Sequence, residues 1–176
     1  MNRFVLAAAL VAATALAAPA DTTLVPAPPP TPVAPADAPT DGANITAADP
    51  AALAEIMKGA GYRADLTADG RGNPLIEFGS SGTKSLVYFF GCTEGKACTT
   101  VQMRVGFDLP DGTTFEVMNA WNRDKRFAKA YVDAENDPYL EMDINLDFGG
   151  ISPGTFRDNL EVWDRLVNDF KTHIGW

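Results

Sequence analysis

Histidine and cysteine are scarce in this sequence, which has one His and two Cys among its 176 residues. Structural zinc sites take four ligands from Cys and His, so Cys92 and Cys98 lack the further ligands that such a site needs. His173, the only histidine, lies at the end of the last predicted helix, where a polar group suits the helix dipole. We therefore predict no metal, no cofactor and no catalytic site that uses histidine.

Basic residues are also few in this chain. It has 14 Lys and Arg against 23 Asp and Glu, a net charge of −9. Nucleic-acid binding needs a basic stripe that neutralises phosphates, so this balance argues against nucleic acid as a partner. An acidic surface favours solubility and a basic partner, which we expect to be a protein.

A long apolar run occurs at the start of the chain, within residues 1–20. Arg3 precedes residues 4–16, which are apolar or small, and small residues follow at Ala17 and Ala20. This pattern is typical of a cleavable signal peptide, whereas a membrane span needs about 20 predominantly apolar residues. We expect cleavage after Ala17 or Ala20 and a periplasmic or secreted protein with no membrane segment after cleavage. An uncleaved N-terminal anchor is the alternative.

Residues 21–44 consist mainly of Pro, Ala, Thr and Asp and offer almost nothing to bury. Prolines concentrate at 26–32, and such a composition favours an extended spacer over a folded segment. A PxxP-like ligand is the functional alternative. We predict that residues 21–44 are a linker and that the folded domain spans residues 45–176.

Helical and extended patterns alternate along residues 45–176. Asp49 as N-cap and Pro50 at the first helical position predict a first helix that ends before Gly61. The last helix opens with Ser152 and Pro153 and carries one apolar stripe. Strands are predicted at 62–67, 75–79, 86–92, 98–107, 127–132 and 140–146. The order α-β-β-β-β-α-β-β-α predicts an α+β domain with three helices and an antiparallel sheet of about six strands.

The strands at 86–92 and 98–107 read as a hairpin with a cysteine at each side of its loop. In an exported chain this spacing favours a disulfide between Cys92 and Cys98; a redox-active pair is the alternative, although the spacing is not Cys-x-x-Cys. If these cysteines face each other, the register places Phe90 opposite Thr100, Tyr88 opposite Gln102 and Leu86 opposite Arg104. The other face is uniformly apolar and is the predicted core face: Val87, Phe89, Val101, Met103, Val105 and Phe107.

Leu86, Tyr88 and Phe90 form a row of large apolar residues on the face opposite this core. Interfaces are enriched in such residues, so we predict that the row is a contact surface for a partner or for a second copy of the chain. The alternative is that a helix or the Pro-rich segment of the same chain covers it.

A helix passes directly into a strand within residues 113–132. Thr113 with Glu116 three residues later is a capping-box pattern, which marks the start of the helix. Apolar residues then follow helical spacing, and the period changes from 3.6 to 2 near Arg126. Trp121 is the largest apolar residue of the helical stripe, so we predict that it lies in the core.

Residues 119–152 contain Asn119-Ala120-Trp121-Asn122, then Arg126 to Tyr131, an acidic turn, an alternating strand and Gly149-Gly150-Ile151-Ser152. This sequence pattern resembles the YbjN family. The resemblance covers roughly residues 50–172, with 117–155 as its specific part. Members of that family are described as regulators of bacterial sensory transduction, and their domain is similar to type III secretion chaperones. Those chaperones act as dimers that bind client segments, so the resemblance allows for a homodimer.

The resemblance also marks family positions to which we assign structural roles: Asn119, Trp121, Asn122, Arg126, Phe127 and Gly150. We interpret Asn119 and Asn122 as local hydrogen bonders that fix the joint between helix and strand. A direct binding role for these two asparagines is the alternative.

Three carboxylates, Glu141, Asp143 and Asp147, share one face of the strand at 140–146. A hydrolytic enzyme that uses Glu141 and Asp143 is therefore the alternative function. The sequence supplies no partner acid, base or pocket, so we interpret this face as exposed and polar. The turn at 133–137 hints at calcium-loop spacing, but Pro138 stands where such a loop needs glycine. The leading hypothesis is a non-catalytic protein-binding or regulatory module of the cell envelope.

Overall fold

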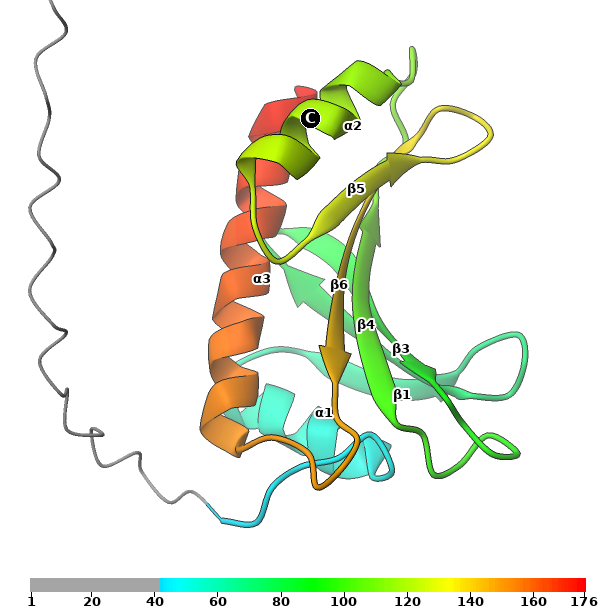
Figure 1. Ribbon diagram of the computed structural model, residues 1–176, viewed down its shortest axis with the longest axis vertical. Coiled ribbons are helices and arrows are strands. Elements are labelled where there is room, and N and C mark those ends of the chain that lie inside the picture. The colour runs from blue at the N-terminus through cyan, green and yellow to red at the C-terminus, as the bar shows by residue number, and fades with distance from the viewer. Residues whose placement is uncertain (1–41) are drawn as a thin grey trace, which may run out of the picture. The chain divides into compact units, whose positions relative to one another are not determined.

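The computed structural model describes residues 42–176, which hold three helices and six strands (Figure 1). The predicted signal peptide (1–20) and most of the predicted linker lie outside the described residues. The elements follow the predicted order. Their bounds are α1 Pro50–Gly59, β1 Ala64–Ala68, β2 Pro74–Ser80, β3 Thr83–Phe90, β4 Thr100–Gly106, α2 Phe115–Asp124, β5 Lys129–Val132, β6 Pro138–Asn145 and α3 Pro153–Ile174.

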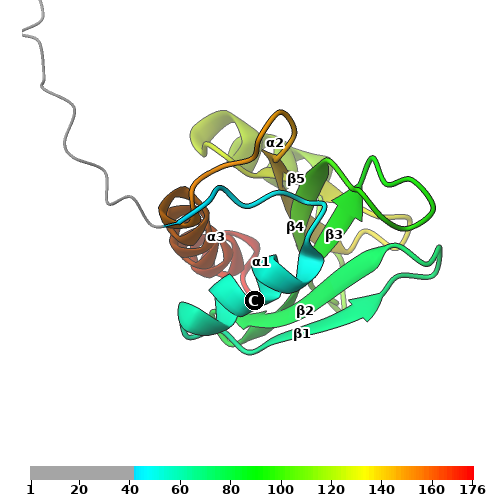
Figure 2. The same ribbon diagram turned by 90° about the horizontal axis from the view of Figure 1, so that it is seen from below.

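The six strands form one antiparallel sheet in the order β1-β2-β3-β4-β6-β5. β1 to β4 pair as consecutive neighbours, and β6 pairs with both β4 and β5. The three helices lie on one side of the sheet, which curves around α1 and α3 (Figure 2). The predicted α+β fold with an antiparallel six-stranded sheet is confirmed.

The core lies between the inner face of the sheet and α3. Ser152 is the N-cap of α3, and its side chain accepts a hydrogen bond from Thr155 N–H over 3.0 Å. Trp163 donates from Nε1 to Ser85 Oγ over 3.2 Å, which gives the only donor of the indole a partner inside the core. The apolar stripe predicted from spacing is fully buried: Phe156, Leu160, Trp163, Val167 and Phe170.

α1 covers the part of the inner face formed by β1 and β2. Asp49 is its N-cap, as predicted, and accepts a backbone hydrogen bond in the first turn. Leu53 and Met57 of this helix are fully buried in the core. Just before α1, Ile45 pairs with Ile151 in an isolated bridge, which ties the start of the described chain to the start of α3.

The start of α2 differs from the prediction by one residue. Thr114, not Thr113, is the N-cap, and its Oγ1 accepts a hydrogen bond from Val117 N–H over 3.4 Å. The predicted capping box of Thr113 and Glu116 is therefore wrong. Thr113 N–H instead donates to the carbonyl of Asn136 over 2.9 Å, which joins it to the turn between β5 and β6.

The register of the β3–β4 hairpin is the predicted one. Phe90 lies opposite Thr100, Tyr88 opposite Gln102 and Leu86 opposite Arg104. The six apolar residues predicted for its core face are all buried: Val87, Phe89, Val101, Met103, Val105 and Phe107. Because side chains alternate along a strand, this register places Leu86, Tyr88 and Phe90 on the outer face of the sheet.

Candidate functional site

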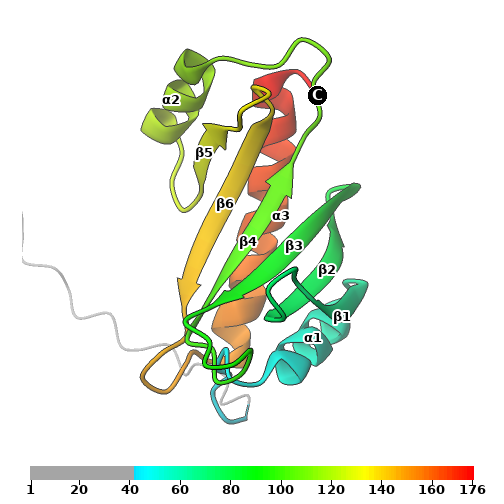
Figure 3. The ribbon, with the colours of Figure 1, turned by 90° about the vertical axis from the view of Figure 1, so that its right-hand side faces the viewer.

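The outer face of the sheet is turned away from α3, which lies behind it in Figure 3. Leu86 and Tyr88 are half-buried on this face, and Phe90 is 41% exposed. The ring centroids of Tyr88 and Phe90 lie 6.4 Å apart. None of the helices within residues 42–176 covers the row, so a covering helix is ruled out for this part of the chain.

Arg104 of β4 stands at the centre of the outer face. Its Nη2 lies 2.6 Å from Glu141 Oε1 and donates to Gln102 Oε1 over 3.0 Å. Its guanidinium carbon lies 4.7 Å from the centre of the Tyr88 ring. The strand pairings place Leu86, Arg104 and Glu141 in one row across the sheet, so these side chains meet on regular backbone.

Glu141 is buried, which corrects the prediction that its strand face is exposed. Its side chain is 6% exposed, Tyr131 donates its hydroxyl to Oε1 over 2.8 Å, and Lys129 Nζ lies 3.5 Å from Oε2. A buried carboxylate is costly unless it is paired and hydrogen-bonded, and this one is both. Asp143 is exposed as predicted, and it accepts hydrogen bonds from Gln102 and Lys129 over 2.7 and 3.1 Å.

Two stacked tyrosines flank this ion pair. The rings of Tyr131 and Tyr139 are nearly parallel, with centroids 5.4 Å apart. Burial and the hydrogen bond to Glu141 raise the pKa of Tyr131 to about 12, so its phenol stays neutral and remains a donor. A Cβ at Gly106 would stand 2.5 Å from the Tyr139 ring. Glycine at this strand position therefore leaves room for the aromatic ring.

A hollow of about 450 Å³ lies on the outer face beside these tyrosines. Leu86 and Tyr139 contribute apolar surface to its wall, and Asp108 and Asp137 also line it. We call it the Asp137 hollow. Asp137 Oδ1 accepts a hydrogen bond from Leu109 N–H over 3.0 Å, which holds that carboxylate in place.

A second hollow, of about 540 Å³, lies beside Phe90 and reaches Asp69 and Asn73 in the loop between β1 and β2. We call it the Asp69 hollow. Asn73 donates from its backbone N–H and its side-chain amide to the Asp69 carboxylate over 2.9 and 3.4 Å. Tyr88 and Arg104 line both hollows, so the two lie next to each other along β3.

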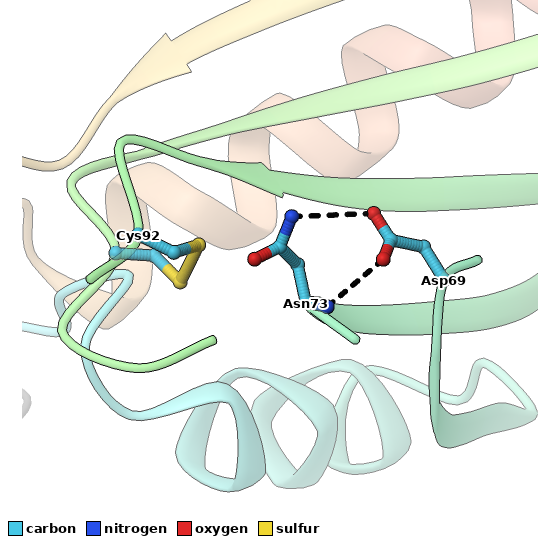
Figure 4. The surroundings of a disulfide bond; sticks show 4 residues. Asp69, Asn73 and Cys92 are labelled. Carbon is cyan, nitrogen blue, oxygen red and sulfur yellow. Dashed lines mark hydrogen bonds between the residues drawn. A yellow bond between two sulfur atoms is a disulfide. The ribbon is translucent and has the colours of Figure 1, made fainter. Parts of the chain in front are cut away.

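A disulfide joins Cys92 and Cys98, as predicted. It closes the loop between β3 and β4, and Cys92 lines the Asp69 hollow. In the same loop Gly95 approaches the β1–β2 loop so closely that a Cβ would stand 2.7 Å from the carbonyl oxygen of Gly72. Figure 4 shows the disulfide beside Asn73. The two loops therefore support each other at this end of the outer face.

Trp121 and Asn122 fasten α2 to the strand that follows it. Trp121 is fully buried, as predicted, and its Nε1 donates to the carbonyl of Ala128 over 3.2 Å. Asn122 donates to the carbonyl of Ala130 over 3.0 Å and accepts from its N–H over 2.8 Å, which is the predicted local role. Asn119 is exposed on α2 and makes no side-chain hydrogen bond within residues 42–176, so the prediction is wrong for this residue.

The joint between α2 and β5 is a tight turn at Phe127. Ala128 N–H donates to the carbonyl of Arg126 over 3.0 Å, and Phe127 between them has a φ of 72°. The Phe127 side chain is 64% exposed, and the Arg126 guanidinium carbon lies 5.0 Å from the centre of its ring. This turn delays the start of β5 to Lys129, two residues after the predicted start.

Gly150 lies where the start of the described chain meets the segment before α3. Its φ is 73°, and a Cβ there would overlap the carbonyl oxygen of Ile45. Ile45 and Ile151 exchange two backbone hydrogen bonds of 2.9 and 3.1 Å across this contact. Only glycine suits a left-handed backbone packed this closely, which explains a structural role for the position.

Comparison with known families supports the assignment drawn from these positions. The YbjN family, described as "Putative bacterial sensory transduction regulator", matches residues 49–176. The chain belongs to the YbjN family. No curated protein matches it. The matched YbjN domain runs from the N-cap of α1 through α3, and therefore includes the outer face and both hollows.

Metal binding and membrane insertion are two further properties to consider for residues 42–176. This part of the chain has no group of three or more His, Cys, Asp and Glu side chains placed to hold a metal ion. In the acidic turn, Asp133 Oδ1 accepts hydrogen bonds from the N–H groups of Glu135 and Asp137 over 3.0 and 2.9 Å. No helix in the same range is long and apolar enough to span a membrane.

The sequence interpretation missed the polar network beside the apolar row. Its members come from three strands: Gln102, Arg104, Lys129, Tyr131, Tyr139, Glu141 and Asp143. The predicted register already placed Arg104 on the outer face beside Leu86. The carboxylates along β6 were the available sequence signal that β6 would lie beside β4 and pair with Arg104.

Proposed function

We propose that this YbjN domain is a non-catalytic protein-binding module with a regulatory role, and that Leu86, Tyr88 and Phe90 form its contact surface. One observation carries the proposal: an apolar row is left open on a face whose central charges already compensate each other. Interface cores are enriched in aromatic residues and arginine. The description of the family as a sensory transduction regulator favours binding over catalysis.

The fixed position of Arg104 supports this proposal. Its guanidinium is held by Glu141 and Gln102 and packs near the ring of Tyr88. Side chains that are already ordered lose little conformational entropy when a partner binds. The outer face therefore presents Tyr88 in a defined position before contact.

The same contacts weigh against a hydrolytic function for Glu141 and Asp143. Glu141 is engaged by Arg104, Tyr131 and Lys129, and Asp143 by Lys129 and Gln102. A general base must reach the proton that it abstracts. Both carboxylates instead have hydrogen-bond donors and cations of the sheet as neighbours, which supports a role in holding the binding face.

We place this function in the cell envelope. The signal-like residues 1–20 support export, and the Cys92–Cys98 disulfide suits an oxidising compartment such as the periplasm. A periplasmic or secreted binding module needs no metal or cofactor for the contact proposed here.

The test compares capture of envelope proteins by three forms of the purified protein. The first is the natural chain and the second carries Tyr88→Ser with Phe90→Ser. The control carries Leu66→Ser with Phe115→Ser, two exposed apolar residues outside the row, 46% and 68% exposed. We expect the natural chain and the control to capture the same proteins and the row variant to lose them, at equal stability to denaturant.

Other outcomes of this comparison have clear meanings. Identical capture by all three forms would contradict the proposed surface. Unfolding of the row variant would show that the row stabilises the monomer instead. Sedimentation of the natural chain as a dimer, with the row variant monomeric, would make a second copy of the chain the partner.

A further inference from the structure

The Asp137 hollow carries negative charge that the surrounding residues do not compensate. Lys84 and Arg104 line it, but Lys84 Nζ lies 2.8 Å from Glu77 and Arg104 lies 2.6 Å from Glu141. Asp108 and Asp137 also line it, and within residues 42–176 neither forms an ion pair. Lys84 and Arg104 are therefore balanced by Glu77 and Glu141, and the carboxylates of Asp108 and Asp137 remain as uncompensated negative charge.

Tyr139, which lines the hollow, also has negatively charged groups nearby. Burial is the largest cause that raises the pKa of Tyr139, and the charges of Asp133 and Asp137 raise it next. Nearby negative charge disfavours the phenolate, so the carboxylates of Asp133 and Asp137 add to the rise in pKa that burial causes. A positively charged group would be favoured in the same place.

The wall of the hollow suits a long side chain with a charged tip. Leu86 and the Tyr139 ring offer apolar surface, and Gly106 lets the ring lie close to the backbone of β4. Lys and Arg pack their aliphatic stems on such surface and keep their charge at a polar end, which Asp108 and Asp137 supply here. An aromatic ring also attracts a cation over its face.

The negative charge of the hollow argues against two covers that the chain itself could supply, namely its Pro-rich segment and a second copy of the chain. The Pro-rich residues 21–44 contain Asp21, Asp37 and Asp41 and no Lys or Arg. A second copy of the chain brings a net charge of −9. Both have the same sign as the hollow, so charge complementarity favours a different and basic partner.

We propose that the Asp137 hollow receives a Lys or Arg side chain of the partner protein, from an extended segment whose apolar residues lie along Tyr88 and Phe90. This inference rests on the proposed function, because it takes the outer face to be the contact surface. It adds the chemistry of the partner: a basic residue at the Asp137 hollow, followed by apolar residues toward the Asp69 hollow.

The probe is a synthetic peptide of about ten residues in which leucine and lysine alternate, about 33 Å long when extended at about 3.3 Å per residue. Binding to the purified protein is measured by fluorescence anisotropy. A matched peptide has glutamate in place of lysine, and a third peptide copies residues 21–41 of this chain, which include all three aspartates of the Pro-rich segment. We expect the lysine peptide to bind and to weaken as salt is raised, because salt screens exposed charges.

The decisive variant carries Asp108→Asn with Asp137→Asn. The matched control carries Asp158→Asn with Glu161→Gln, which removes the same charge from two exposed residues of α3. We expect the hollow variant to bind the lysine peptide about five- to tenfold more weakly, the size expected for two exposed ion pairs. The control should bind as the natural chain does. Asparagine keeps an acceptor for Leu109 N–H, and equal denaturation midpoints would confirm that the variant is folded.

Each other result overturns the inference in a distinguishable way. Equal weakening in the hollow variant and the α3 control would mean general attraction to an acidic protein. Equal binding of the glutamate peptide, or tighter binding of the peptide that copies residues 21–41, would assign another occupant. If Tyr88→Ser with Phe90→Ser abolishes binding while the hollow variant does not, the outer face stands as the contact surface and only the basic-residue site fails. If neither variant changes binding, both proposals fail.

Discussion

Arg104 Nη2 lies 2.6 Å from Glu141 Oε1 on a face of the sheet that no helix of residues 42–176 covers. The Glu141 side chain is only 6% exposed, although its strand alternates as a half-exposed strand does. Neighbouring side chains, not a layer of secondary structure, bury it: Arg104, Tyr131 and Lys129 contact its two oxygens. A polar network can therefore bury a carboxylate on an outer sheet face.

We predict that Glu141→Gln destabilises the protein more than Asp143→Asn does. Removing one partner of a buried ion pair costs about 3 to 5 kcal/mol, and we expect about 2 to 3 here because the Arg104 side chain is 30% exposed. Asp143 is exposed, so its loss should cost less than about 1 kcal/mol. Denaturant unfolding of both variants at neutral pH measures this difference. Equal losses would show that the Glu141 pair contributes no more than a surface pair.

The second prediction concerns alkaline pH and Tyr131. The folded-state pKa of Tyr131 is raised from 10.0 to about 12, by burial and then by Glu141. The folded state therefore holds this proton more tightly than the unfolded state does. The associated stability is fully present below about pH 10 and is lost as pH rises from about 10 through about 12.

Tyr131→Phe should remove this loss, because phenylalanine has no proton to release. We expect the natural chain to be more stable than the variant below about pH 10, and the gap to narrow between about pH 10 and 12. Ultraviolet titration of tyrosinate in the folded protein should also show one late-titrating tyrosine fewer in the variant. A constant stability gap across this pH range would contradict the assignment.

Our third prediction is that the protein is exported and oxidised. Mass spectrometry of the protein from its host should show a chain that starts after Ala17 or Ala20 and contains no free thiol. Cys92→Ser with Cys98→Ser should lower the free energy of unfolding by roughly 2 kcal/mol, because the closed loop is short. An intact Met1 would contradict export, and two free thiols would contradict oxidation.

The register of the β3–β4 hairpin could be predicted because three local signals agree. Two cysteines, a short loop and an unbroken apolar alternation fix which residues face each other, and one slipped residue would turn Val87 and Phe89 outward. The stripe of α3 and the cap of α1 likewise depend only on neighbours in sequence. These parts of the fold depend on contacts within a single helix or a single hairpin, so a short stretch of sequence is enough to predict them.

The burial of Glu141 could not be predicted by the same means. Alternation shows that Glu141 and Leu140 point to opposite faces, but it does not show which strand lies beside β6. Pairing between β4 and β6 joins strands that are separated in sequence by α2 and β5. The ion pair with Arg104 exists only through that non-local pairing. The start of α2 was missed for a smaller reason, since Thr113 and Thr114 offer the same capping oxygen.

The last prediction separates two reasons for glycine at neighbouring positions. Gly149 and Gly150 both have positive φ, of 98° and 73°. A Cβ at Gly149 meets nothing within 4 Å, whereas one at Gly150 would overlap the carbonyl of Ile45. Gly149→Ala should therefore cost only the backbone strain, about 1 to 2 kcal/mol. Gly150→Ala should cost about 1 to 3 kcal/mol more, because the Ile45–Ile151 bridge must shift.

Denaturant unfolding of the two alanine variants measures this difference directly. Hydrogen exchange at the N–H groups of Ile45 and Ile151 should also speed up in Gly150→Ala and not in Gly149→Ala, because these groups form the bridge. Equal stability of the two variants with unchanged exchange at the bridge would show that the chain relaxes around the new methyl group. The close packing of Gly150 against Ile45 would then not be what requires glycine there.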